Sequence, residues 1–377
     1  MLTLSLKPVA PFTHQTAKCP TPPKCCISER GHCFDIGDTF FRHESATGRD
    51  LGVLAAAIYK KSHNALRVLD AMCGCGIRSL RYLAEADADF VMANDANEEY
   101  GSVITGNLER AAKEHGKIRD GLFRIRMRTG DSSFLRSALG AVKLDGLLYL
   151  TSTDGFSSGG HRPQHSLAAY GAYVRPMPYS NEIGLRMLIG GAVREASVLG
   201  YHVVPLFSYY SYHGPVFRVM LRVRRGKLPD NRHYSFISYC SRCGNSYAIS
   251  WDKLSAIGCS CNANVPGSLI VSGPLWTGPL HSAPFLTEML NLAEQWGLDE
   301  QWHGKTTRKV ASRAKLNSPP LVTILSTLHK EGYAASRSHV ASNAIKTNCL
   351  MADCVRIVKE LQQCTSENEK YQQVVEA

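Results

Sequence analysis

Residues 66–96 read LRVLDAMCGCGIRSLRYLAEADADFVMANDA and decide the fold. A short apolar run closes on the carboxylate of Asp70, and the Gly74-Cys75-Gly76 turn then leads into a segment whose apolar residues recur at helical spacing. A second apolar run, FVMAN, ends at Asp95, about twenty residues past the glycines, where a Rossmann-type unit places the group that holds a ribose. The pattern predicts a strand, a tight glycine turn, a helix and a second strand, which together start a nucleoside-binding βαβ unit.

The details of this turn distinguish between two nucleoside cofactors. A dinucleotide site has a third glycine that allows close helix packing beside a pyrophosphate, and this chain has Ser79 at that position. Asp70 suits the cationic, phosphate-free amino-acid end of S-adenosylmethionine better than it suits a pyrophosphate. We therefore expect S-adenosylmethionine, with Asp70, Gly74, Gly76 and Asp95 as candidate cofactor residues. The alternatives are an NAD-type oxidoreductase and a plain α/β turn that binds no ligand.

The composition is that of a globular protein with a polyanionic partner. The chain has 377 residues, 44% of them hydrophobic, enough for about two or three domains. No apolar run approaches the roughly eighteen residues that a membrane-spanning helix needs, so we expect no membrane insertion. A formal net charge of +11 favours nucleic acid as the partner, although a basic protein without such a partner is the alternative. The close cysteine pairs among the thirteen cysteines are typical of metal chemistry in a reducing compartment.

The N-terminal region carries a targeting signal or a tail, followed by a helix. Residues 1–28 contain no Asp or Glu and are rich in Pro, Thr, Ser and Lys, which fits import into a plastid or another organelle. A disordered tail on a nuclear or cytoplasmic protein is the alternative. Further on, Arg49 and Asp50 open an apolar helix. We expect Arg49 either to reach the carboxylate of the cofactor or to form an ion pair at the helix start.

The segment after Asp95 is too short for the expected sheet. LFRIRMR, residues 122–128, has a strand pattern, SSFLRSALGAVK predicts a helix capped by Asp131 or Ser132, and LDGLLYLTSTD predicts the next buried strand. A doubly wound sheet normally fits a third strand, a helix and a fourth strand into this interval, and a βαβ unit takes roughly thirty residues. Further along, residues 155–178 form a glycine-rich substrate loop or a solvated loop. The residues around His213-Gly214 then join two antiparallel strands that complete the sheet.

Two later segments carry metal-binding and nucleic-acid signals. Cys240, Cys243, Cys259 and Cys261 form two close pairs, which predicts a closed tetrahedral Zn²⁺ shell of structural type, with free buried cysteines as the alternative. Between residues 305 and 315 the chain has several basic side chains and no acidic one, which predicts a positive surface for nucleic acid or a solvated face. The basic residues are Lys305, Arg308, Lys309, Arg313 and Lys315.

The order of these motifs resembles the tRNA guanosine-26 N2-dimethyltransferase family. The motifs are RDLGVL, LDAMCGCGIRSLRY, NDA, TSTDGFSSGG, YGAYVRPMPYSNEIGLRMLIGGAVREA, the four cysteines, SGPLWTGPL and EGYAASRSH followed by AIKT, and they span about residues 40–347. The resemblance implies a class I methyltransferase domain that uses S-adenosylmethionine. It also implies a C-terminal domain that helps to bind tRNA and holds a cysteine zinc site in many members. By position, Arg49, Arg67 and Asp95 resemble the cofactor-binding residues of the family.

One family motif has no match in this chain. The family carries a catalytic Asp-x-Asp-Pro-(Phe/Tyr)-Gly motif at the end of its fourth strand, just before the helix matched here by SSFLRSALGAVK. This chain has Arg128-Thr-Gly-Asp131 in that place. The segment with the third and fourth strands is missing, in agreement with the strand count. Asp131 is the nearby carboxylate, and we expect it either to stand in for the general base or to cap the following helix.

The sequence thus predicts an α/β protein with a class I (Rossmann-like) methyltransferase sheet and a C-terminal zinc-containing α+β domain. The expected activity is methyl transfer to N2 of a guanine in tRNA, and the alternative is a catalytically impaired isoform that only binds tRNA. We expect no membrane association and no obligate protein partner. The expected parts are a disordered or transit segment (1–37), the methyltransferase domain (38–228), a zinc and tRNA-binding domain (229–350) and a charged helical tail (351–377).

Overall fold

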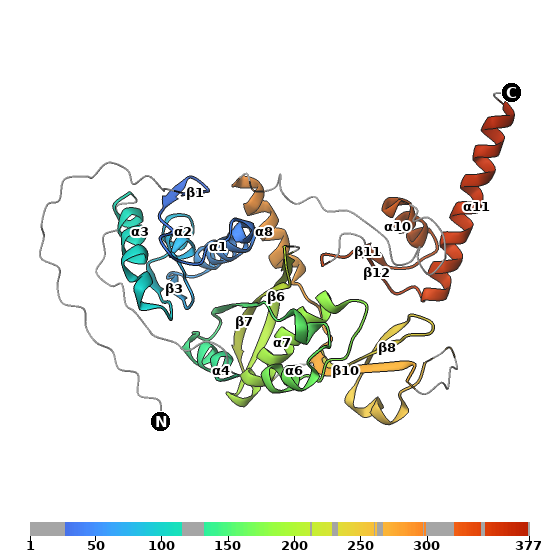
Figure 1. Ribbon diagram of the computed structural model, residues 1–377, viewed down its shortest axis with the longest axis horizontal. Helices are drawn as coiled ribbons and strands as arrows, with labels where there is room; N and C mark the ends of the chain where they lie inside the picture. The colour runs from blue at the N-terminus through green and yellow to red at the C-terminus, as the bar shows by residue number, and fades with distance from the viewer. Residues whose placement is uncertain are drawn as a thin grey trace, which may run out of the picture. The chain divides into compact units, whose positions relative to one another are not determined.

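The computed structural model describes residues 27–114, 132–211, 213–227, 233–259, 261, 267–296, 298, 320–340 and 344–375 (Figure 1). Residues 1–26, LFRIRMR, Asp131 and the basic segment 305–315 lie outside this set, so the expectations placed on them stay predictions. The chain divides into two compact units, Met1–Phe134 with Thr287–Trp296 and Leu135–Leu286 with Gly297–Ala377. The division at Phe134 falls within the predicted domain 38–228.

The first unit contains the predicted glycine-turn motif. Strand β3 (Arg67–Asp70) runs into the turn, helix α2 (Ile77–Ala84) follows it, and β4 (Phe90–Ala93) pairs in parallel with β3. This arrangement confirms the predicted strand, turn, helix and second strand. The core between these elements buries the side chains of Phe34, Leu80 and Leu108. The unit also contains the hairpin β1 (Ile27–Glu29) and β2 (His32–Phe34), the helices α1 (Ala46–Ser62) and α3 (Gly101–Glu114), and the short helices η1 (His43–Ser45) and η2 (Glu98–Tyr100).

The second unit is built on a three-stranded sheet in the order β5-β7-β6, formed by β5 (Leu147–Ser152), β7 (Val216–Arg225) and β6 (Tyr201–Ser211). Both pairings are antiparallel, so β5 and β6 run parallel to each other with β7 reversed between them. The predicted hairpin around residue 213 is therefore confirmed. Helices α4 (Ser132–Ala141) and α7 (Ser180–Val198) pack on the sheet through a core that includes Leu139, Ile189 and Phe217.

Residues 115–131, where the sequence predicts too few strands, lie outside the described residues, so the shortfall stays a prediction. Along the chain, β4 ends at Ala93 and the next strand that the structure describes is β5, which begins at Leu147. Within the part of the chain that the structure describes, β3 pairs with β4 alone and β5 pairs with β7 alone. The third and fourth strands of a doubly wound sheet thus have no counterpart among the described residues.

The remainder of the second unit consists of smaller sheets and helices. Its second sheet has the antiparallel order β10-β8-β9, and a further hairpin is flanked by two helices that pack around Leu328 and Ile357. Val340, in the connection within that hairpin, is buried in the same core as Phe217. The elements are β8 (Tyr234–Cys240), β9 (Ser246–Ile249), η4 (Trp251–Ala256), β10 (Leu269–Trp276), α8 (Ala283–Gln295, shared between the units), α10 (Leu321–Lys330), β11 (Ala335–Arg337), β12 (Ile345–Thr347) and α11 (Met351–Val375).

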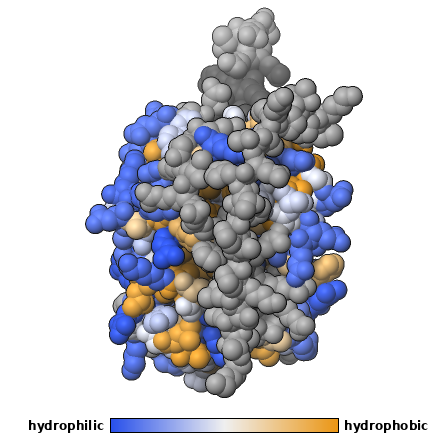
Figure 2. Space-filling view, turned by 90° about the vertical axis from the view of Figure 1, so that its left-hand side faces the viewer, coloured by the Kyte–Doolittle hydropathy of each residue, from blue (hydrophilic) through white to orange (hydrophobic). Residues whose placement is uncertain are grey.

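None of the helices in the described ranges combines the length and the apolar character needed to cross a bilayer. On the face shown in Figure 2, hydrophobic side chains lie in small groups among hydrophilic ones.

The packing of α7 on the sheet predicts different costs for two alanine substitutions. A Cβ at Gly184 would lie 2.3 Å from Cε1 of the fully buried Phe217 ring. Gly184→Ala should therefore lower the free energy of unfolding by about 1–3 kcal/mol, as is typical of an overpacked core. At Gly191 the nearest atom would be the Tyr170 carbonyl oxygen at 3.4 Å, so Gly191→Ala should be neutral or stabilise by up to about 1 kcal/mol. Urea unfolding of both variants tests this, and equal stabilities would show that the Phe217 ring moves aside freely.

Candidate active site and thiol cluster

The glycine turn places the carboxylate of Asp95 beside the end of β3. The backbone N–H of Gly74 donates to Oδ2 of Asp95 at 2.9 Å. Gly74 and Gly76 have φ values of +56° and +83°, and a Cβ at Gly74 would lie 3.1 Å from the carbonyl oxygen of Phe40. Glycine is required there because a side chain would combine a left-handed backbone with a close approach to another segment. Asp95 thus lies where a nucleoside-binding unit holds its ribose.

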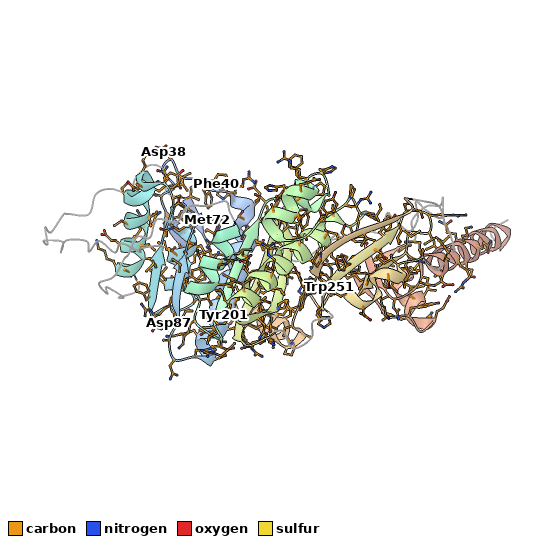
Figure 3. All side chains as sticks on the ribbon, turned by 90° about the horizontal axis from the view of Figure 1, so that it is seen from below. Asp38, Phe40, Met72, Asp87, Tyr201 and Trp251 are labelled. Carbon is orange, nitrogen blue, oxygen red and sulfur yellow. The ribbon has the colours of Figure 1, made fainter. Side chains whose placement is uncertain are left out.

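Exposed apolar side chains lie near this turn. Phe40 is 70% exposed and Met72, which follows β3, is 46% exposed. In Figure 3 both lie at the same end of the first unit, and Asp87, which precedes β4, lies at the opposite end. Met72 therefore marks the carboxyl ends of the parallel strands, where open α/β sheets bind their ligands.

Asp70 has a different environment from the one expected. Its carboxylate is buried, its Oδ2 accepts from the hydroxyl of Ser79 at 2.8 Å, and its Oδ1 accepts from Nε of Arg78 at 3.1 Å. Both oxygens are thus engaged within the protein, and Asp70 ties β3 to the first turn of α2. A contact between Asp70 and the ammonium group of a cofactor stays a prediction. In such a contact the ammonium group would compete with Arg78 for the carboxylate of Asp70. Ser79, which replaces the third glycine, supplies one of these anchoring hydrogen bonds.

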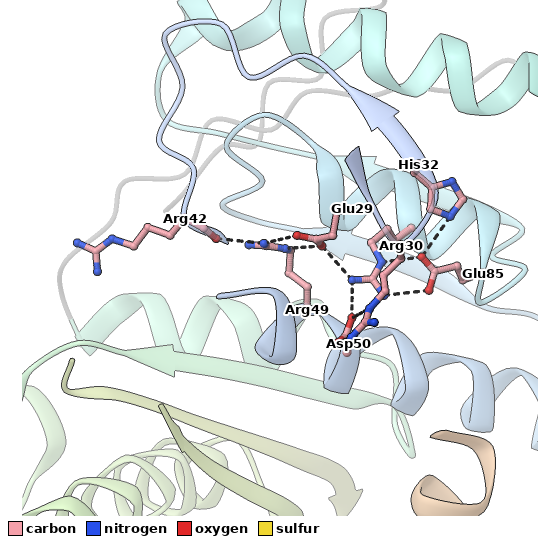
Figure 4. Close-up of polar contacts among 8 residues, drawn as sticks. Glu29, Arg30, His32, Arg42, Arg49, Asp50 and Glu85 are labelled. Carbon is pink, nitrogen blue, oxygen red and sulfur yellow. Dashed lines mark hydrogen bonds and ion pairs between the residues drawn. The ribbon is translucent and has the colours of Figure 1, made fainter. Parts of the chain in front are cut away.

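The two candidate arginines lie in contrasting surroundings. Arg67 is exposed, and its guanidinium lies 5.0 Å from the centre of the Phe90 ring. Arg49 is buried, its Nε donates to Oε1 of Glu29 at 2.8 Å, and its Nη2 donates to the carbonyl oxygen of Arg42 at 3.1 Å (Figure 4). Arg49 also acts on the glycine turn through its charge. Burial raises the pKa of the Cys75 thiol in this turn, and the positive charge of Arg49 opposes part of that rise.

The four predicted metal-binding cysteines come together in the second unit. Their Sγ atoms all lie within 4.8 Å of one another, with 3.8 Å between Cys240 and Cys261 and 3.3 Å between Cys243 and Cys259. None of them forms a disulfide. A tetrahedral ion with metal–sulfur bonds of about 2.3 Å holds its sulfur atoms about 3.8 Å apart, so the cluster fits such an ion. The backbone N–H of Cys243 helps to lower the pKa of Cys240 to about 6, which favours the thiolate that a metal binds.

A second polar cluster, which the sequence did not reveal, fixes the C-terminal hairpin to the sheet. The rings of His281 and His339 lie edge to face, with 4.2 Å between their centres. The backbone N–H of Ser208 on β6 donates to Nδ1 of His281, and its hydroxyl forms a hydrogen bond with Nε2 of His339. Burial lowers their pKa values to about 4 and about 3, so both rings are neutral at pH 7. Beside them Glu182 on α7 pairs with Lys346 on β12 at 2.9 Å and with Arg186 at 2.7 Å. Residues more than a hundred positions apart form this cluster, and no local motif marks it.

The predicted substrate loop forms two short helices, α5 (Gly155–Ser158) and α6 (Pro163–Tyr170). The side chain of Phe156 is 60% exposed, and the guanidinium of Arg162 lies 4.7 Å from the centre of its ring. The carboxylate of Asp154 accepts from the N–H of Ser157 at 2.9 Å and caps α5. The loop thus presents an aromatic ring and a cation next to the carboxyl end of β5.

The fold is that of the class I methyltransferases within the α/β proteins. The structure of Trm1 from Pyrococcus horikoshii in complex with S-adenosyl-L-methionine is similar, with a TM-score of 0.71 and 21% identity over 88% of this chain and 99% of that one. A family model described as N2,N2-dimethylguanosine tRNA methyltransferase matches residues 29–124, 129–308 and 303–359. The chain belongs to this family.

Curated relatives agree with the family assignment. The tRNA (guanine(26)-N(2))-dimethyltransferase of Saccharolobus solfataricus is 28% identical, with 85% of this chain and 91% of the relative covered. Relatives of the same name from Metallosphaera sedula and Pyrobaculum aerophilum are 27% and 26% identical. They cover 85% and 82% of this chain, and the matches take in 88% and 86% of those relatives. The likeness thus extends over most of each protein.

The pairing of Glu182 predicts a pH-dependent contribution to stability. Burial alone would raise the pKa of Glu182, but Arg186 and Lys346 hold it below its usual range. A carboxylate with a lowered pKa stabilises the fold above its unfolded pKa, and that stability is lost as the pH falls through the folded pKa. Glu182→Gln should therefore cost about 1–3 kcal/mol at pH 7 and progressively less below about pH 4.5.

Urea unfolding of Glu182→Gln and of the wild-type chain between pH 7 and pH 3.5 measures this difference. Glu288→Gln, at an exposed position on α8, is the control and should show little effect at any pH. A Glu182→Gln cost that is constant across this range would contradict the assignment of the stabilisation to the charged pair.

Proposed function

We propose that this chain transfers methyl groups from S-adenosylmethionine to the exocyclic N2 of guanine 26 in tRNA. The observation that carries the proposal is the family match along most of the chain together with the Asp95–Gly74 geometry of its turn. The relatives named above are dimethyltransferases, which favours an enzyme over a protein that only binds tRNA. An NAD-type oxidoreductase is disfavoured by the same matches.

The residues at the turn suit the donor. Gly74 and Gly76 let the backbone approach a nucleoside closely, and the half-buried carboxylate of Asp95 can accept hydrogen bonds from ribose hydroxyls. Arg49 and Arg67 supply positive charge for the carboxylate of the donor. When bound, S-adenosylmethionine supplies an electrophilic methyl group on its sulfonium. The chain's part is to position donor and guanine, to exclude water, and to accept the proton that N2 releases.

The loop around Phe156 supports RNA as the substrate. RNA-binding proteins recognise unstacked bases by stacking them on aromatic rings and on arginine planes, and Phe156 with Arg162 presents both. The target guanine must leave its stack to reach the donor. The net charge of +11 adds long-range attraction to the phosphate backbone. The basic residues between 305 and 315 belong to the same proposal, although they lie outside the described residues.

We further propose that the catalytic segment before α4 is missing and that Asp131 stands in as general base. Three observations support the deletion. The family match is interrupted between residues 124 and 129, and the two compact units divide at Phe134. In addition, the alignment with the Saccharolobus solfataricus relative spans 359 positions, but it includes only 85% of the 377 residues of this chain, which is fewer than 359 residues. Some aligned positions therefore hold residues of the relative that this chain lacks.

Methyl incorporation from labelled S-adenosylmethionine into unmodified tRNA tests both proposals. The unaltered chain is compared with a variant in which a segment like that of the family is inserted between Gly130 and Asp131. We expect N2-methylated guanosine at position 26 in both reactions and a rate about tenfold or more higher for the restored version. A well-placed general base typically contributes about a hundredfold or more, and Asp131 as a stand-in would supply only part of that gain. Equal rates would show that the segment is dispensable. Methylation by neither version would leave a tRNA-binding protein as the function.

We propose Zn²⁺ as the ion of the thiol cluster, in a structural role. Four thiolates fill a tetrahedral shell and leave no open position for chemistry. Zn²⁺ prefers such soft ligands, and binding by Cys240, Cys243, Cys259 and Cys261 would pin the end of β8 to the loop after η4.

Metal analysis of the purified chain should find about one zinc per molecule. Cys240→Ser should remove the ion and lower the melting temperature, because structural zinc contributes folding free energy. Cys33→Ser, at an exposed cysteine outside the cluster, is the matched control and should retain the ion. Unchanged zinc content and melting in Cys240→Ser would contradict the assignment.

A further inference from the structure

A buried network of charges links the β1–β2 hairpin to helices α1 and α2 in the first unit (Figure 4). It contains three arginines and three carboxylates, so the charges balance. At its centre Arg81 is fully buried, and its guanidinium binds the carboxylates of Glu29, Asp50 and Glu85. The six residues are Glu29, Arg30, Arg49, Asp50, Arg81 and Glu85.

Glu29, at the end of β1, joins this network to Arg49. Its Oε1 accepts from Nε of Arg49 at 2.8 Å and from Nη1 of Arg81 at 3.0 Å, and its Oε2 accepts from Nη2 of Arg49. The Arg49–Glu29 pair is therefore bidentate, which fixes the plane of the guanidinium. Because Glu29 is held by Arg81 in turn, the orientation of Arg49 is set by the protein before any ligand arrives.

The bidentate pair uses only one side of the Arg49 guanidinium. Nε and Nη2 are engaged by Glu29, and Nη2 also by the carbonyl oxygen of Arg42, but among the described residues Nη1 has no hydrogen-bond acceptor. The ring of Phe41 lies 5.0 Å from the guanidinium and restricts its movement further. The two N–H groups of Nη1 are thus the donors that remain for an anion near the turn.

We propose that Glu29 is a positioning residue for the methyl donor: it clamps Arg49 so that the unengaged Nη1 receives the carboxylate of the donor's amino-acid end. The inference rests on the proposed function, since it takes S-adenosylmethionine as the ligand. Without the Glu29 charge, three arginines would face two carboxylates in a buried site, and Arg49 would regain side-chain freedom. The β1–β2 hairpin, which has no part in the nucleoside-binding βαβ unit, thereby becomes part of the cofactor site.

Glu85 provides a matched control within the same network. Its carboxylate accepts from Nε and Nη2 of Arg81 at 2.6 Å and 2.9 Å, and it makes no contact with Arg49. Glu85→Gln removes one negative charge from the network, as Glu29→Gln does, but leaves the clamp on Arg49 intact. A general loss of structure should appear in both variants, whereas a positioning effect should appear in Glu29→Gln alone.

Calorimetric titration of the full chain with two ligands tests the proposal. S-adenosylhomocysteine carries the amino-acid end, and methylthioadenosine has the same nucleoside without it. Glu29→Gln should weaken S-adenosylhomocysteine about tenfold or more, equivalent to about 1.4 kcal/mol, and change methylthioadenosine by less than about twofold. Glu85→Gln should change neither ligand by more than about twofold. If Glu29→Gln is too unstable to titrate, Glu29→Asp keeps the charge and should show a smaller loss confined to S-adenosylhomocysteine.

Three outcomes would overturn the proposal. They are an equal weakening of both ligands by the Glu29 variants, no weakening of either ligand, and the same selective loss in Glu85→Gln. A wild-type chain that binds neither ligand would instead overturn the proposed function itself, so the two failures can be told apart.

Discussion

The hydrogen bond from the Gly74 N–H to Asp95 is the interaction on which the candidate site depends. It joins the turn after β3 to Asp95, two residues past the end of β4, so the carboxyl ends of two parallel strands are held together. The bond forms only because Gly74 adopts a left-handed backbone with no side chain facing Phe40. Buried charges also hold the elements of this unit together: Asp70 binds Ser79 and Arg78, and Arg81 binds three carboxylates.

The chain forms two compact units, and each unit has its own sheet. In a doubly wound sheet, the central parallel strands are buried on both faces and hydrogen-bonded at both edges. The described residues contain β3 with β4 and, separately, β5 with β7 and β6, each with its own core. The deletion proposed above would remove one such central strand. The family's catalytic motif ends such a strand, so the proposed deletion would remove that motif together with the strand.

Local sequence patterns predict much of this structure, but they do not predict the contacts between residues far apart in the sequence. The glycine turn, the order of β3, α2 and β4, the antiparallel β6–β7 pair and the four clustered cysteines were all readable, because each depends on residues close in sequence. The sequence predicts a contact between Asp70 and the cofactor from the position and charge of this residue. No sequence rule shows that Arg78 and Ser79 bind its carboxylate oxygens. The pairing of Glu29 with Arg81 joins residues 52 positions apart, and that of Ser208 with His339 joins residues 131 positions apart. Such pairings depend on the completed fold.

The burial of Val340 in the same core as Phe217 has a consequence for the synthesis of the protein. The ribosome makes the strands of the β5–β7–β6 sheet more than a hundred residues before it makes Val340, His339 and Lys346. Until these residues emerge, the core has a vacancy, Ser208 lacks His339, and Glu182 has Arg186 without Lys346. The second unit therefore completes its folding only after residues 339–346 have been translated. A messenger RNA cut short before codon 339 yields a nascent chain with an open core, which is the kind of product that chaperones retain and proteases remove.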